Sequence, residues 1–204
     1  MKRFHLHAVS GLVAASAADS VLFAWRNPGV NVQWIERIHV KWRTTTGPTA
    51  AQEIAIQANY CSLFGVNFTD GSDLSDPATA GNYAVRNTSL DLQRVTTLLQ
   101  TPVSQLASGN VRIATTAGLT AGATAPTVEA HPWAWDSFAE RAAAATVPLG
   151  FAEFIWEPPV ARMDHDDPQK GCWPLRPDTG FIVRLPIATV VMVGRVSVGV
   201  DWLE

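Results

Sequence analysis

Apolar and polar positions alternate along much of this chain, and this pattern predicts β-strands. Residues 32–42 form a long alternation of this kind, which is typical of an antiparallel strand that buries one face. One face would carry Val32, Trp34, Glu36, Ile38, Val40 and Trp42, and the other Gln33, Ile35, Arg37, His39 and Lys41. We expect residues 21–26 to pair with this strand through a turn at Asn27-Pro28-Gly29.

Shorter alternations predict further strands at 53–58, 111–115, 181–185 and 190–203. In the last of these, one face would carry Val196, Val198, Val200 and Trp202, and the other Arg195, Ser197, Gly199 and Asp201. Helical patterns are few. Residues 90–106 contain some i, i+3 apolar pairs, but β-branched residues and Pro102 interrupt them. The best short helix is predicted at 136–145, which opens near Asp136 and is rich in alanine.

The spacing of these strands predicts the fold class. Fourteen glycines and thirteen prolines separate short strands throughout the 204 residues. We therefore expect an all-β protein, an antiparallel β-sandwich or jelly-roll-like single domain over residues 1–204 with at most a short helix. Long loops are expected at about 69–82, 117–132 and 156–178.

Composition narrows the class of protein. Hydrophobic residues make up 47% and charged residues 16%, so the chain has enough apolar surface to fold. The net charge of −3 lacks the basic footprint of a nucleic-acid-binding protein. Twelve of the fifteen basic residues are arginine, and there are eight tryptophans, a combination typical of protein interfaces. A GC-rich coding genome would also favour arginine.

The N-terminus and the cysteines bear on the cellular compartment. Basic residues at positions 2–3 and the sequence Ala15-Ser16-Ala17 resemble a signal peptide, but His5 and His7 interrupt the apolar region, so we expect this segment to belong to the folded domain. No apolar run reaches the roughly 18 residues that span a membrane. Cys61 and Cys172 match neither a disulfide framework nor a zinc site. We interpret both as small buried apolar residues, with a disulfide between them as the alternative.

Two polar clusters could carry chemistry. Asp164-His165-Asp166-Asp167 could bind calcium or supply a hydrolase with a base at His165, but Pro168 occupies the third ligand position of the EF-hand pattern. We interpret this cluster as a solvated acidic loop. The second cluster, which is typical of turns, contains Asp70, Asp73 and Asp76.

Histidines could also hold a metal ion. His5 and His7 would share one face of a strand and, with His39, could bind a transition metal, but no recognisable ligand spacing supports this and we favour ordinary strand residues. The chain contains no nucleophile elbow, P-loop, dinucleotide motif or zinc-protease helix motif. We therefore predict no enzyme, no cofactor and no metal site.

Three aromatic residues form the candidate binding site. Trp133, Trp135 and Phe138 follow His131-Pro132 in a segment of irregular pattern. They could plug one end of the sandwich, stack on sugar rings or anchor a partner protein. We name them as the candidate partner interface.

Several blocks together resemble a known group. The strand at 34–38 with 49–53, the block 86–89, the strand 111–115 with 119–122, the strand 180–184 and the terminal Trp202-Leu203-Glu204 carry the likeness. On these residues the chain resembles small β-sandwich proteins encoded among the virion genes of tailed bacteriophages. Residues 133–178 lie outside the resemblance.

The resemblance implies a structural role in the phage particle. The expected function is that of a head decoration (cement) protein that binds and stabilises the capsid through protein–protein contacts. A tail, baseplate or fibre component and a carbohydrate-binding β-sandwich module are the alternatives. The expected partners are the major capsid protein or other virion proteins, without nucleic acid or membrane, and the expected oligomer is a homotrimer.

Overall fold

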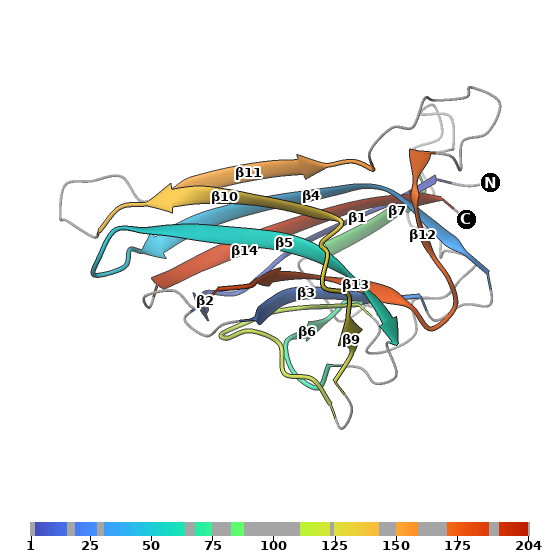
Figure 1. Cartoon of the computed structure of the whole chain (residues 1–204), viewed down its shortest axis with the longest axis horizontal. Coiled ribbons are helices and arrows are strands. Elements are labelled where there is room, and N and C mark those ends of the chain that lie inside the picture. Colours follow the sequence, from blue (N-terminus) through green and yellow to red (C-terminus); the bar gives the residue numbers. More distant parts are fainter. Residues whose placement is uncertain are drawn as a thin grey trace.

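The chain folds into two antiparallel β-sheets that pack face to face, as the computed structural model in Figure 1 shows. The structure describes residues 3–15, 19–27, 31–63, 68–74, 83–87, 111–122, 125–142, 150–158, 171–187 and 192–203. All the secondary-structure elements assigned among these residues are strands. The predicted all-β sandwich is confirmed.

The first sheet, called sheet A here, has β14 and β4 at its centre. Its strands run in the order β11-β4-β14-β1-β7, with β12 also on β4 and β2 also on β14. The bounds are β1 Arg3–Val9, β2 Val13–Ala15, β4 Gln33–Thr46, β7 Tyr83–Asn87, β11 Phe151–Trp156, β12 Trp173–Leu175 and β14 Met192–Leu203. The N-terminal segment is therefore part of the sheet, because β1 lies between β14 and β7.

The second sheet, sheet B, has the order β10-β5-β13-β3-β8-β6, with β9 also on β5. The bounds are β3 Ser20–Arg26, β5 Gln52–Leu63, β6 Ser72–Asp73, β8 Val111–Ile113, β9 Thr127–Val128, β10 Ala134–Glu140 and β13 Gly180–Leu185. The three segments predicted as long loops contain the short strands β6, β9 and β12. The strands predicted near 53–58, 111–115 and 181–185 correspond to β5, β8 and β13.

Aromatic rings fill the space between the sheets. Trp25 of sheet B meets Trp202 of sheet A edge-on, with ring centroids 4.8 Å apart. Phe4 stacks on Trp202 at 5.4 Å, and Phe181 stacks on Trp25 at 6.2 Å. All four side chains are fully buried. Aromatic burial on this scale, together with edge-to-face contacts, contributes strongly to the stability of a sandwich.

The alternation in β14 is confirmed. Val196, Val198, Val200 and Trp202 are buried, whereas Arg195 is exposed and Ser197 and Asp201 are half-buried. Since β14 has β4 on one side and β1 on the other, its side chains can bury only the face that meets sheet B. β14 therefore has one apolar face and one polar face although it lies in the centre of the sheet.

The alternation in β4 is confirmed only in its second half. Ile38, Val40 and Trp42 are buried as expected, but at the start of the strand Gln33 and Ile35 are buried while Trp34 and Glu36 are half-exposed. The register against β14 shifts between Asp201 and Trp202, which pair with Arg37 and Ile35. This β-bulge adds one residue to β4 and exchanges its two faces, so the face predicted for residues 32–36 was wrong.

The predicted hairpin between residues 21–26 and 32–42 was also wrong. Strand β3 pairs with β13 and β8 in sheet B, whereas β4 pairs with β14, β11 and β12 in sheet A. The connection crosses from one sheet to the other. Asn27 is fully buried at this crossing, where its side-chain amide donates to the carbonyls of Leu175 and Asn31, both at 2.8 Å.

The helix predicted at 136–145 was wrong where it can be checked. Residues 134–140 form β10, which pairs with β5 along its whole length. The alanine run behind the helix prediction lies at 142–145, after the strand ends, whereas residues 134–140 include Trp135 and Phe138, which favour a strand. Residues 143–145, and the weak helical pattern at 90–106, lie outside the described residues.

Candidate interaction surface

One side of the sandwich is formed by one edge strand from each sheet. In the described part of the chain, β10 pairs only with β5, and β11 pairs only with β4 (Figure 1). The two strands face each other across the interior, where the rings of Phe138 and Phe154 lie 6.2 Å apart. We call this side, formed by β10 and β11, the open edge. Unpaired strand edges are ready sites for pairing with another chain.

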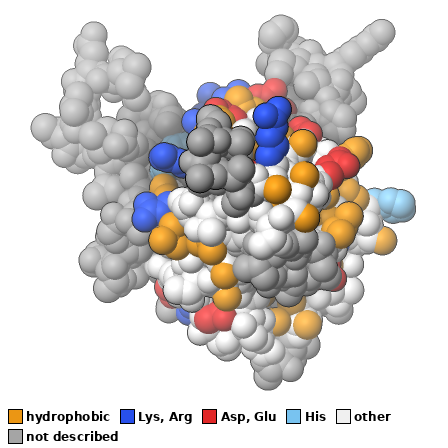
Figure 2. Space-filling view, turned by 90° about the vertical axis from the view of Figure 1, so that its left-hand side faces the viewer, with side chains coloured by type: hydrophobic (Ala, Val, Ile, Leu, Met, Phe, Trp, Pro, Cys, Tyr) orange, Lys and Arg blue, Asp and Glu red, His pale blue; other side chains and the backbone are white. Residues whose placement is uncertain are grey.

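Large apolar side chains are exposed on the open edge. Trp135 on β10 is 67% exposed, and Phe151 and Ile155 on β11 are 62% and 58% exposed. Figure 2 views the end of the molecule where β10 ends and β11 begins, and hydrophobic side chains lie there among charged ones. Exposed apolar groups of this size on an unpaired strand are typical of an interaction surface.

A buried polar chain holds the two edge strands together. The Trp42 indole donates to Thr44 Oγ1 at 2.9 Å, and that hydroxyl donates to Glu140 Oε2 at 2.6 Å. Glu140 Oε1 accepts from the Gly150 N–H at 3.0 Å. A side chain at Gly150 would overlap the Glu140 carboxylate, which would then have to move from this position. The carboxylate thus connects the end of β10 to β4 and to the start of β11.

The three aromatics predicted as a partner interface have different environments. Trp133 is packed, because its ring stacks on Tyr60 at 5.4 Å and on Trp173 at 5.2 Å. Phe138 is half-buried against Phe154. Trp135 alone among the three is largely exposed. The structure therefore leaves Trp135 as the residue of this set that is most accessible to a partner.

The outer surface of sheet A beside the open edge is polar and crossed by ion pairs. Glu153 on β11 accepts from Lys41 Nζ at 3.0 Å and lies 2.7 Å from His39 Nε2. Hydrogen bonds from Lys41 and then from His39 lower the pKa of Glu153. Farther along the sheet, the Arg3 guanidinium binds both carboxylate oxygens of Glu36 at 2.7 Å. Each of these contacts places a basic side chain against a carboxylate.

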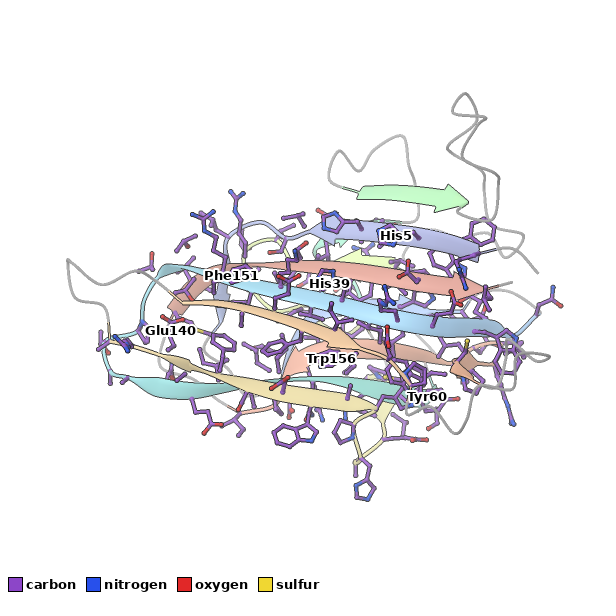
Figure 3. The ribbon with its side chains drawn as sticks, turned by 90° about the horizontal axis from the view of Figure 1, so that it is seen from above. His5, His39, Tyr60, Glu140, Phe151 and Trp156 are labelled. Atoms are coloured by element: carbon purple, nitrogen blue, oxygen red, sulfur yellow. The ribbon has the colours of Figure 1, made fainter. Side chains whose placement is uncertain are left out.

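His5, His7 and His39 lie on this same surface, but each has its own partner. Figure 3 labels His5 and His39 on this surface. His5 Nδ1 is 2.6 Å from Asp201, and His7 Nε2 is 2.7 Å from the Ser197 hydroxyl. Burial, followed by the nearby His5 and His39, lowers the pKa of His7. Within the described ranges, no three histidine, cysteine, aspartate or glutamate side chains are placed to hold a metal ion.

At residues 70–73 the glycine has the conformation expected of a turn, whereas the two aspartates make contacts outside the turn. Gly71 has a positive φ of 74°, and Asp70 Oδ1 accepts from the Thr120 N–H at 2.7 Å. Asp73 lies in β6 and faces Arg112 at 3.9 Å. Asp76 and the cluster Asp164-His165-Asp166-Asp167 lie outside the described residues.

A shallow hollow lies beside the packed aromatics. It measures about 260 Å³ and is lined by Tyr60, Glu129, Trp133, Pro174 and Arg176. Its aromatic lining favours the sugar-binding alternative. However, Trp133 already stacks on two other rings, which reduces the ring surface that a sugar could cover.

The two cysteines do not form a disulfide with each other. Cys61 is buried, as predicted, and burial raises its pKa to about 12. Cys172 is only half-buried, and burial raises its pKa to about 11. Both thiols are therefore protonated near neutral pH and are poor nucleophiles.

No protein-family model, curated protein or solved structure matches the chain. No helix among the residues described is long and apolar enough to cross a membrane.

Sequence reasoning missed Phe151 and Ile155. The segment Phe-Ala-Glu-Phe-Ile-Trp at 151–156 is strongly apolar, and its β-branched and aromatic content is a strand signal. The burial pattern of β11 in the structure shows that two of these side chains lie on the face that points away from sheet B and stay exposed.

Proposed function

We propose that this chain is a structural protein of a tailed-bacteriophage particle, a head decoration protein that binds the capsid through protein–protein contacts. The observation that carries the proposal is the open edge, where two unpaired strands expose Trp135, Phe151 and Ile155. Burial of such aromatic and aliphatic anchors provides most of the free energy of a typical protein interface. The resemblance of several sequence blocks to small virion proteins points to the same role.

Stabilisation of the capsid follows from linkage. A subunit that binds only assembled capsid protein lowers the free energy of the assembled state relative to the dissociated state. The described part of the chain has the features that a capsid-stabilising subunit needs, a large aromatic core and a side that presents apolar groups to a partner. A tail, baseplate or fibre component would use the same features and differs in copy number.

The first experiment is quantitative mass spectrometry of purified particles, with the major shell protein as the reference. A copy number equal to that of the shell protein, or a fixed large fraction of it, is expected for a decoration protein. A few copies per particle would move the chain to the tail. Absence from the particle would overturn the proposal and leave the carbohydrate-binding module as the next function to test.

A binding experiment tests the surface. Heads that lack this chain are incubated with the purified protein, and the bound fraction is measured by co-sedimentation. Trp135→Ala should weaken binding at least tenfold, which corresponds to about 1.4 kcal/mol. Ile187→Ala is the matched control, because Ile187 is also 64% exposed but lies outside the open edge. Equal binding by both variants and the wild-type chain would exclude Trp135 from the interface.

A further inference from the structure

On the side of β11 that faces away from β4, the backbone N–H and C=O groups belong to every second residue. The Thr44 N–H donates to the Gly150 carbonyl at 2.9 Å, in register with the pairing of β4 and β11. Antiparallel strands alternate between residues that bond to one neighbour and residues that bond to the other. The backbone groups of Phe151, Glu153 and Ile155 therefore point away from β4, toward the unpaired side. An incoming strand must place its own outward-pointing residues opposite these three.

The side chains of β11 are complementary to a second copy of the same strand. In an antiparallel pair centred on Glu153, Phe151 lies opposite Ile155 of the second copy, and Ile155 opposite its Phe151. On the inner surface, Ala152 lies opposite the second copy's Phe154. Each apolar group on the outer surface thus meets an apolar group, and a small residue meets a large one on the inner surface.

Other registers lack this match. A shift by one residue would set outward-pointing groups against inward-pointing ones, which the hydrogen-bond pattern does not allow. A shift to a pair centred on Phe154 would place Glu153 opposite Ile155 and Phe151 opposite Glu157. The pair centred on Glu153 sets both exposed apolar side chains of each copy opposite an apolar side chain of the other.

The one like-charged pair in this register is compensated. Two Glu153 carboxylates would face each other, which by itself is destabilising. Each carboxylate, however, already binds Lys41 Nζ at 3.0 Å and lies 2.7 Å from His39 Nε2 within its own chain. The negative charge is therefore balanced before the strands meet.

We propose that β11 is the seam of a twofold homodimer, in which two β11 strands pair antiparallel about Glu153 and sheet A continues through both copies. This inference deepens the proposed function by naming a second copy as one partner. The twofold seam gives a dimer rather than the trimer expected from the sequence, since the same surface is used on both copies. Trp135, on β10, stays available to a different virion protein.

Oligomeric state is the first test. Light scattering coupled to size-exclusion chromatography should give twice the 22.0 kDa of one chain, across micromolar to millimolar loading. Ile155→Arg should shift the mass to that of a monomer, whereas Ile187→Arg, at a comparably exposed position outside β11, should remain dimeric. Circular dichroism and thermal melting show that each variant is folded. A monomer at every concentration, or a dimer unaffected by Ile155→Arg, would overturn the seam.

Cysteine cross-linking tests the register. Glu153→Cys should form an intermolecular disulfide with itself, because antiparallel partners bring their Cα atoms within about 5.5 Å. Ile155→Cys alone should not cross-link, but an equimolar mixture with Phe151→Cys should give the mixed dimer. The wild-type chain, with both natural cysteines, is the control. Cross-linking of Ile155→Cys with itself, or no cross-link at Glu153→Cys, would refute this pairing.

The tests separate the seam from the function. A monomeric chain that is abundant in particles would remove the seam and keep the structural role. A dimer with the expected register that is absent from particles would keep the seam and remove the role.

Discussion

Replacing Thr44 by valine tests the polar chain that joins the two sheets beside the open edge. The Thr44 hydroxyl accepts from the Trp42 indole at 2.9 Å and donates to Glu140 Oε2 at 2.6 Å. Thr44 and Glu140 are each only 2% exposed, and Trp42 is fully buried. Valine has nearly the shape of threonine, so the substitution removes both hydrogen bonds while it preserves most of the packing.

The cost can be worked out group by group. The Trp42 indole would lose its acceptor, and an unsatisfied buried donor costs about 1–3 kcal/mol. Glu140 would lose one of its two hydrogen-bond donors, and a hydrogen bond to a charged group is worth about 1.5–3 kcal/mol. We therefore expect Thr44→Val to lower the free energy of unfolding by about 3–5 kcal/mol. That is a large part of the roughly 5–15 kcal/mol typical of a domain.

Equilibrium unfolding in urea, followed by tryptophan fluorescence, measures this loss. Thr46→Val is the matched control, because Thr46 lies two residues along the same strand and is exposed. It should change the free energy of unfolding by less than about 0.5 kcal/mol. If the free energy of unfolding of Thr44→Val is also within about 0.5 kcal/mol of the wild-type value, the hydrogen bonds of Thr44 do not contribute to stability and the reasoning is refuted.

Three further predictions follow from other buried groups. The Trp156 indole N–H is buried without a hydrogen-bond acceptor among the described residues, whereas the Trp25 indole donates a 2.9 Å hydrogen bond to a buried glutamine. Trp156→Phe should therefore lower the free energy of unfolding clearly less than Trp25→Phe does. Equal losses in urea titrations would contradict this. A side chain at Gly194 would overlap the ring of a core tryptophan, so Gly194→Ala should cost about 1–3 kcal/mol, and an unchanged melting temperature would show that the core adjusts freely. Cys61 and Cys172 have pKa values raised to about 12 and 11, so both should react slowly with iodoacetamide at pH 8. Both should react faster as the pH rises toward 11, and Cys172 should do so at a lower pH than Cys61. Rapid labelling of Cys61 in the folded chain at pH 8 would contradict this.

The sequence by itself determined the class of fold and the burial pattern of the central strands. Alternation in β14 predicted its buried face, because a strand in the middle of a sheet can cover its apolar side only against the opposite sheet. The same holds for the second half of β4, at Ile38, Val40 and Trp42. Within the candidate site, Trp135 was one of three aromatics named from the sequence as a candidate partner interface, and it is the most exposed of the three.

Sheet membership and strand register were decided by the tertiary structure. Strand β3 is buried on nearly all its positions, so its pattern gives no face and does not distinguish the two sheets as partners. The bulge near Glu36 arises from pairing with β14, about 165 residues away in the chain, and no local pattern marks it. Ala139 and the alanines at 142–145 suggested a helix locally, but pairing with β5 places residues 134–140 in a strand.

The open edge likewise exists only in three dimensions. An apolar residue in a strand is equally compatible with burial and exposure, and Phe151 and Ile155 are exposed because they lie on the face of β11 that points away from sheet B. The polar chain that supports this edge joins Thr44 to Glu140, which are 96 residues apart. Alternation reports only on residues two positions apart, so it predicts strands and their faces. Contacts between distant segments decide which strand has no neighbour and which apolar side chains remain available to a partner.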